Sequence, residues 1–192
     1  GISTVGDYNW EVYQIGWPII YAQSTMVEPQ FDLTNTSNTN DSNYIIILTV
    51  TDPITECYHS YISDTITVFH IPDADFTLST NPICAPDTIT VTDASITGNT
   101  LDYSWNISPT TGTNIIDPNL YTTDISFPDN QSGSSNMYDI ILTVTDQITT
   151  CENTDTIPVE LWTRPISDFD IDPFTCGPAT FDSITNNSQF AN

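Results

Sequence analysis

The sequence predicts an all-β chain of tandem β-sandwich modules, and two observations lead to this fold class. The first is internal repetition: a strand-like run from Tyr138 to Asp146 has an earlier copy from Tyr44 to Asp52, 94 residues before it. The second is composition, because Thr, Ile, Val and Tyr favour strands, while the abundant Asn, Asp, Pro and Ser favour turns. Repetition at a fixed period is typical of module arrays, which favours a structural role over an enzymatic one.

The repeat extends over the whole chain with a period of about 93 residues. Its spacing drifts by one residue at a time, as small loop insertions between copies of one unit would produce. The matched elements are Tyr8-Asn9-Trp10 with Tyr103-Ser104-Trp105, Cys57 with Cys151, Asp75-Phe76 with Asp168-Phe169, and Cys84 with Cys176. We therefore expect residues 1–71 to be the C-terminal part of one module, 72–164 a complete module, and 165–192 the N-terminal part of the next.

Composition and charge limit the classes of partner. The chain carries 25 acidic residues against one basic residue, Arg164, for a net charge of -24. Nucleic acid and anionic membrane surfaces are excluded as partners because both are bound through Lys and Arg. No apolar run is long enough for direct membrane insertion. Four cysteines at repeating positions indicate disulfides and an oxidising, extracellular location.

The expected strands of the first, partial module are read from alternation and from apolar runs. Tyr8 and Trp10 lie on one strand face, and Tyr44–Val50 has the continuous apolar character of a strand in the middle of a sandwich. Further strands are expected at Ile19–Ala22, Phe31–Leu33 and Asp64–Ile71.

The complete module contains seven expected strands, with turns between them every 8–12 residues or so, which is the pattern of a sandwich. The clearest are Asp75–Ser79, Thr88–Asp93, Leu101–Ile107, Tyr138–Asp146 and Asp155–Trp162, with two weaker ones around Ile115 and Ile125. The expected core consists of the inward-facing apolar residues Phe76, Ile89, Val91, Trp105, Ile107, Ile125, Phe127, Ile140, Leu142, Val144, Ile157 and Val159.

The order of these features resembles polycystic-kidney-disease-type (PKD) domains, which are seven-stranded immunoglobulin-like sandwiches. The elements that carry the resemblance are Asp75-Phe76, Tyr103-Ser104-Trp105 and the run from Tyr138 to Asp146. One departure is the stretch Asn106-Ile107-Ser108-Pro109, where the family often has Gly-Asp-Gly. The paired Cys-Ala/Gly-Pro elements are similar to repeat arrays of type IX-secreted bacterial surface proteins. This resemblance implies an adhesin stalk or gliding-type filament at the cell surface.

The cysteines are expected to form disulfides between modules. In an immunoglobulin-like module Cys84 and Cys151 lie at opposite ends, about one strand length apart, which is too far for a bond. The geometry that works joins the far-end loop of one module to the near-end loop of the next, so that Cys57, Cys84, Cys151 and Cys176 pair with cysteines of other modules. The competing arrangement, Cys57 with Cys84 and Cys151 with Cys176, requires modules that fold back on each other.

Calcium is the one cofactor that the resemblance suggests. In some PKD-type modules the loops at one end bind it, and the matching positions here are Asp93, Asp102 and Asp146. Oxygen ligands from several loops suit this ion. The competing interpretation, which we favour, is that Asp52, Asp93 and Asp146 cap turns through their side chains.

Glycans are a further expectation from the resemblance. Asp-Thr-Ile and Asp-Ser-Ile segments resemble the O-glycan acceptor pattern of the same bacterial group, with acceptors at Thr65, Thr88, Thr156 and Ser183. The competing interpretation is a turn residue that leads into a strand.

Catalysis is not expected, because His59 and His70 are the only histidines and neither has a counterpart in the repeat. The sequence therefore predicts a structural segment of an extracellular filament or adhesin stalk. Its partners would be neighbouring modules, other copies of itself, or surface glycans. Two alternatives are a carbohydrate-binding module, with Trp17, Tyr21 and Trp162 as exposed aromatic platforms, and an accessory spacer of a secreted hydrolase.

Overall fold

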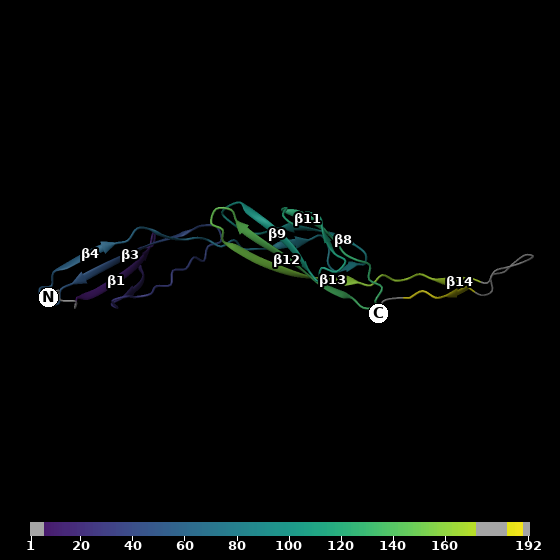
Figure 1. The fold of residues 1–192 in the computed structure, drawn as a ribbon, viewed down its shortest axis with the longest axis horizontal. Helices are drawn as coiled ribbons and strands as arrows, with labels where there is room; N and C mark the ends of the chain where they lie inside the picture. The colour runs from purple at the N-terminus through teal and green to yellow at the C-terminus, as the bar shows by residue number, and fades with distance from the viewer. Residues whose placement is uncertain (1–5, 172–183, 190–192) are drawn as a thin grey trace, which may run out of the picture. The chain divides into compact units, whose positions relative to one another are not determined.

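The structure is a computed structural model that describes residues 6–171 and 184–189, and its regular elements within these ranges are all β-strands (Figure 1). No helix in the described part of the chain is long and apolar enough to cross a membrane. The strands are β1 (Asp7–Gln14), β2 (Ile20–Ser24), β3 (Ser42–Thr51), β4 (Tyr58–Ile62), β5 (Ile66–Val68), β6 (Phe76–Leu78), β7 (Ile83–Cys84), β8 (Thr88–Asp93), β9 (Leu101–Ser108), β10 (Asn114–Ile115), β11 (Thr122–Ser126), β12 (Asn136–Asp146), β13 (Glu152–Trp162), β14 (Phe169–Ile171) and β15 (Ile184–Asn186).

The chain divides into two compact units. Unit 1 consists of Gly1–Pro72 together with two turns, Ile96–Thr100 and Asp146–Cys151. Unit 2 consists of Asp73–Ser95, Leu101–Thr145 and Glu152–Asn192. The division between the units falls next to the expected boundary at residue 72, but two turns that lie inside the expected second module belong to unit 1, and residues 165–192, expected to begin a third module, belong to unit 2.

Unit 2 contains a two-layered β-sandwich. One sheet has the strand order β10-β11-β8-β6 and the other has the order β7-β13-β12-β9. Residues from both sheets form one apolar cluster, in which the Trp105 ring of β9 packs against Phe76 of β6. Eleven of the twelve expected core residues are buried, and Ile157 is partly buried against the same cluster. The alternating pattern of the sequence therefore predicted the core.

One strand of this sandwich was not expected. The sequence predicts no strand between Asp75–Ser79 and Thr88–Asp93, but Ile83 and Cys84 form β7, which pairs in parallel with Leu161 and Trp162 at the end of β13. The pairing is extended by a hydrogen bond from Ala85 N to Trp162 O, 3.1 Å long. It forms because the Ile83 side chain is buried in the core, and the strand that anchors it is 78 residues away in sequence.

The described part of unit 1 contains one sheet with the order β2-β1-β3-β4, and β5 also pairs with β3. Figure 1 labels β1, β3 and β4 of this sheet. In the β1–β3 ladder, Trp10 lies opposite Leu48 and Val12 lies opposite Ile46. Val12 and Tyr44 are the two apolar residues in the described part of this unit that are fully buried. Ile46, Leu48 and Val50 of β3 are half-buried, although their counterparts in β12, Ile140, Leu142 and Val144, are buried.

The strand expected at Phe31–Leu33 is absent from the structure. The burial of this segment alternates as it does in a strand, with Phe31 and Leu33 half-buried and Asp32 exposed. The segment nevertheless pairs with no strand. Its counterpart in the repeat is β11, which is held in place by pairing with β8. The described part of unit 1 has no counterpart of β8, and this explains the missing strand.

Candidate functional site

The most distinctive polar cluster in the described residues surrounds His70 in unit 1. His70 is 3% exposed, and its Nδ1 lies 2.7 Å from Asp41 Oδ1, which also accepts a hydrogen bond from the His70 backbone N–H. On the other side of the ring, Nε2 lies 3.3 Å from Asp146 Oδ2. That distance fits an ion pair, but the angles do not fit a hydrogen bond, and Nε2 has no hydrogen-bond partner. We therefore describe the Asp146 contact as electrostatic.

The carboxylate of Asp146 is held by the turn that follows β12. Its Oδ1 accepts hydrogen bonds from the backbone N–H groups of Ile148 and Thr149, and its Oδ2 accepts one from the Asn99 side-chain amide. Burial alone raises the pKa of Asp146, but these donors outweigh burial and hold the pKa at about 2. Asp146 is therefore ionised inside the protein at neutral pH.

The turn after β3 repeats this geometry around Asp52. Asp52 Oδ1 accepts hydrogen bonds from the N–H groups of Ile54 and Thr55, which lower the pKa of Asp52. Both turns also place a non-glycine residue in the left-handed region, with φ of 59° at Glu56 and 60° at Thr150. The two turns differ in their surroundings, because Asp52 is exposed and Asp146 is fully buried.

The cluster around His70 is suited to stability rather than to catalysis. Both ring nitrogens of His70 face carboxylates, so the ring activates no hydroxyl or thiol. The hydrogen bond from the His70 ring, followed by the one from its backbone N–H, lowers the pKa of Asp41. Sequence reasoning missed this cluster. The available signal was that Asp41 and His70 are absent from the second copy, where Ser135 and Thr163 stand.

The expected calcium ligands do not form a metal cluster. Asp93 Oδ1 accepts hydrogen bonds from the backbone N–H and the hydroxyl of Ser95, and Asp102 lies exposed on β9. Within residues 6–171 and 184–189, no group of three His, Cys, Asp or Glu side chains could hold a metal ion. Asp52, Asp93 and Asp146 each cap a turn through the side chain, and a calcium site remains a prediction.

The described cysteines are free thiols. Cys57 and Cys84 are exposed and Cys151 is half-buried, while Cys176 lies outside the described residues. Cys151 immediately precedes β13, and Cys84 pairs with Trp162 at the other end of the same strand. Eleven strand residues at roughly 3.3 Å each separate the two by far more than disulfide reach. Pairing with cysteines of other modules remains a prediction.

Three of the four expected glycan acceptors lie in the described residues, and all three are exposed. Thr65 immediately precedes β5, Thr88 is the first residue of β8, and Thr156 lies within β13. Ser183 lies outside the described residues. The Asp87 side chain accepts a hydrogen bond from Thr88 N, whereas the Thr88 hydroxyl forms no hydrogen bond within the described residues. Glycosylation at these positions stays a prediction.

The exposed aromatic side chains are the main feature that suggests a ligand. Trp17 is 63% exposed and lines a small hollow of about 80 Å³ with Gln14, Ile20 and Tyr21. Tyr21 is held by neighbouring residues, because its ring meets the Tyr44 ring edge to face at 5.0 Å and its hydroxyl shares a hydrogen bond with the Thr34 hydroxyl. The two rings therefore do not form one flat platform, and Trp17 is the more exposed of the two, while Trp162 is exposed on unit 2.

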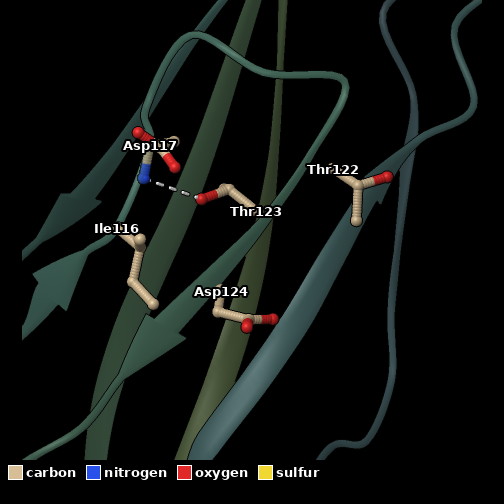
Figure 2. A pocket seen from close by; sticks show the side chains of 5 residues that line it. All are labelled: Ile116, Asp117, Thr122, Thr123 and Asp124. Carbon is tan, nitrogen blue, oxygen red and sulfur yellow. Dashed lines mark hydrogen bonds between the residues drawn. The ribbon is translucent and has the colours of Figure 1, made fainter.

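A second hollow, of about 180 Å³, lies in unit 2 beside β11 (Figure 2). It is lined by Ile116, Asp117, Thr122, Thr123 and Asp124. Figure 2 shows Thr123 accepting a hydrogen bond from the Asp117 backbone N–H, 3.1 Å long. Asp124 Oδ1 accepts a hydrogen bond from the Thr90 hydroxyl at 2.7 Å. Two of the polar side chains that line this hollow are thus already hydrogen-bonded within unit 2. The hollow is therefore a weaker candidate for a binding site than the surface around Trp17.

Unit 1 therefore combines the buried cluster around His70 with an exposed tryptophan, Trp17, and unit 2 also has an exposed tryptophan, Trp162. Comparison with known proteins adds no further identification: no protein-family model matches this sequence, and no curated protein is significantly similar to it.

Proposed function

We propose that this chain is a structural repeat segment of an extracellular filament or adhesin stalk on a bacterial cell surface. The observation that carries the proposal is the recurrence of one hydrogen-bond network in both units. Asn35 Nδ2 donates to Asn40 O and Val68 O, and Asn130 Nδ2 donates to Ser134 O and Leu161 O.

A further contact of the same network also recurs, which supports equivalent modules. Asn35 Oδ1 also accepts from Ser37 N, as Asn130 Oδ1 accepts from Ser132 N. Side chains that fix the same loop in each copy serve the geometry of the module and not a local reaction. In arrays of this kind stability is nearly local, and each module adds a fixed length.

The cysteines support a role under tension. Cys84 and Cys151 are attached to opposite ends of β13, so disulfides from both to neighbouring modules would join successive modules through one strand. Such links would resist pulling along the filament. The net charge of -24, with glycans on Thr65, Thr88 and Thr156, would keep neighbouring shafts from associating sideways.

Mass spectrometry of the protein isolated from its native cells, under non-reducing conditions, tests this proposal. Peptides that link Cys84 to the Cys151 position of a neighbouring module, with no free thiol, would support a covalently joined stalk. Added hexose or deoxyhexose mass on Thr65, Thr88, Thr156 or Ser183 would support a glycosylated surface protein. Free thiols on unmodified peptides from an intracellular fraction would contradict the proposal.

A second candidate function, carbohydrate binding, rests on Trp17. Exposed tryptophan rings stack on the apolar faces of sugars, and Trp17 has no counterpart in the second copy. Calorimetric titration of the chain with a panel of oligosaccharides checks it. Loss of binding in Trp17→Ala, with retention in the control Tyr58→Ala at a more exposed aromatic position, would favour this function. No heat change with any sugar in the native chain would oppose it.

A further inference from the structure

The two copies of the repeated strand run differ at a single residue. The runs Tyr44–Asp52 and Tyr138–Asp146 have Ile45 in the first copy and Asp139 in the second, and every other position is identical. Ile45 is half-buried, whereas Asp139 is exposed. The second copy therefore carries a charge inside its run, while the first copy is uncharged from Ser42 to Thr51 and contains no proline or glycine there.

Ile45 lies in an apolar patch on the outer face of the sheet in unit 1. This is the face opposite to the one that buries Val12 and Tyr44, because side chains alternate between the two faces of a strand. The patch, from β1, β3 and β4, consists of Tyr13, Ile45, Ile47 and Ile62. The counterparts in unit 2 are Ser108, Asp139, Ile141 and Thr156, of which three are polar and exposed. In unit 2 the same face is open to solvent, so the patch is not part of the face that packs inside the sandwich.

Pairing within unit 1 covers this strand while the unit is folded. Along one edge β3 pairs with β1, and along the other it pairs with β4 and β5. The strand therefore offers no free edge to another chain. Its backbone groups become available for other pairings only when unit 1 opens.

We propose that Tyr44–Val50 is a latent self-association segment, which stacks on the same segment of other copies of this chain as a cross-β assembly when unit 1 opens. Seven β-prone, uncharged residues without proline or glycine are the sequence signature of such stacking. The occupant is a second copy because in-register stacking places every residue on its own kind. Both faces of the strand take part, since Ile45 and Ile47 make the outer face apolar as well.

The second copy of the run is protected from this association by Asp139. In-register stacking would place the Asp139 carboxylates of successive chains one strand spacing apart, about 4.7–4.8 Å, where like charges repel. Proline adds to this protection, because Pro158 lies opposite Asp139 on β13 and donates no backbone hydrogen bond. The chain thus has one unprotected segment and one protected segment of otherwise identical sequence.

Incubation of the 192-residue chain at pH 7, above the unfolding temperatures of both units and with a reductant present to exclude disulfides, tests the proposal. Salt at 0.5 M, about three times physiological ionic strength, screens the charge of -24. We expect thioflavin fluorescence to rise with time, and fibre diffraction to show spacings of about 4.7 Å and about 10 Å from stacked strands and facing sheets. Ile45→Asp assembles at least about tenfold more slowly. The control Ile54→Asp, which adds the same charge at an exposed turn residue, assembles like the native chain.

Exchange of the two residues between the copies provides a second test. A double variant that combines Ile45→Asp with Asp139→Ile has the composition and net charge of the native chain, but its uncharged run lies in the second copy. We expect this variant to recover the assembly that Ile45→Asp loses. Because both units are unfolded during the incubation, effects of the substitutions on folding do not enter the comparison.

Three outcomes would overturn the proposal. They are a native chain that forms no cross-β assembly, an Ile45→Asp variant that assembles as fast as the native chain, and a double variant as slow as Ile45→Asp. None of them bears on the disulfide and glycan tests of the stalk, which involve other residues.

Discussion

The rings of Phe76 and Trp105 meet edge to face in unit 2, with their centroids 5.1 Å apart and their planes at 89°. Phe76 lies on β6 and Trp105 on β9, which belong to different sheets. The contact therefore joins the two layers of the sandwich, and it combines apolar burial with a favourable arrangement of the two ring quadrupoles.

Truncation of this contact should cost much of the stability of unit 2. We expect Phe76→Ala to lower the free energy of unfolding by about 3–5 kcal/mol, because it removes a buried ring and leaves a cavity. Urea unfolding followed by tryptophan fluorescence measures the change. Met137→Ala, at an exposed position on β12, serves as control and should change stability by less than about 0.5 kcal/mol. Equal losses in both variants would contradict the packing described here.

Removal of the buried side-chain amide of Asn130 should also lower the stability of unit 2, though by less than Phe76→Ala. Asn130→Ala leaves Leu161 O and Ser134 O without their donor, which should cost about 1–3 kcal/mol. Asn35→Ala should have a smaller effect, because Asn35 is only half-buried. Hydrogen exchange resolved by residue can locate each loss. We expect faster exchange in unit 2 for Asn130→Ala and in unit 1 for Asn35→Ala, and a change that spreads equally over both units would count against local stability.

The contact between Asp41 and His70 predicts a specific titration. The His70 ring lowers the pKa of Asp41, so removing the ring should raise that pKa toward the ordinary value of 3.8. Carbon-detected NMR of the Asp41 carboxyl, in the native chain and in His70→Asn, measures the shift. His59→Asn replaces an exposed histidine and should leave the Asp41 titration unchanged. If His70→Asn left it unchanged as well, the ion cluster would have no energetic role.

Asp146 predicts how unit 1 responds to acid. Its pKa of about 2 in the folded protein lies below the value of 3.8 for a free carboxyl, so its contribution to stability is complete above about pH 4. That contribution is lost as the pH falls from about 4 to about 2. In Asp146→Asn we expect lower stability at neutral pH and a flatter dependence in this range, measured by thermal unfolding. Asp139→Asn, at an exposed position, should keep the native profile.

Local sequence patterns predicted the strands and the core, because burial on a sandwich is read directly from alternation. Ile140, Leu142 and Val144 alternate along β12 and are all fully buried. The same signal could not predict whether a strand finds a partner. Phe31 and Leu33 alternate as strand residues do, but pairing depends on a neighbouring strand that the described part of unit 1 does not contain.

The His70 cluster was beyond sequence reasoning for a related reason. Its four polar groups come from residues 41, 70, 99 and 146, which are far apart in the chain and show no shared motif. Strand β7 was missed in the same way, since Ile83 gains its strand partner only when Leu161 is brought beside it. Both features arise from contacts that no local periodicity encodes.

The strands β14 and β15 pair in the same register as β6 and β8, since Phe169 lies opposite Asn186 as Phe76 lies opposite Asp93. This match has an evolutionary consequence. Because the two copies keep the same pairings and the same turn hydrogen bonds, unequal recombination between their coding segments would add or remove one whole period. Every strand in the recombined product would still meet a strand of the register it requires. The length of the chain could therefore change by whole periods without creating a strand that lacks its partner.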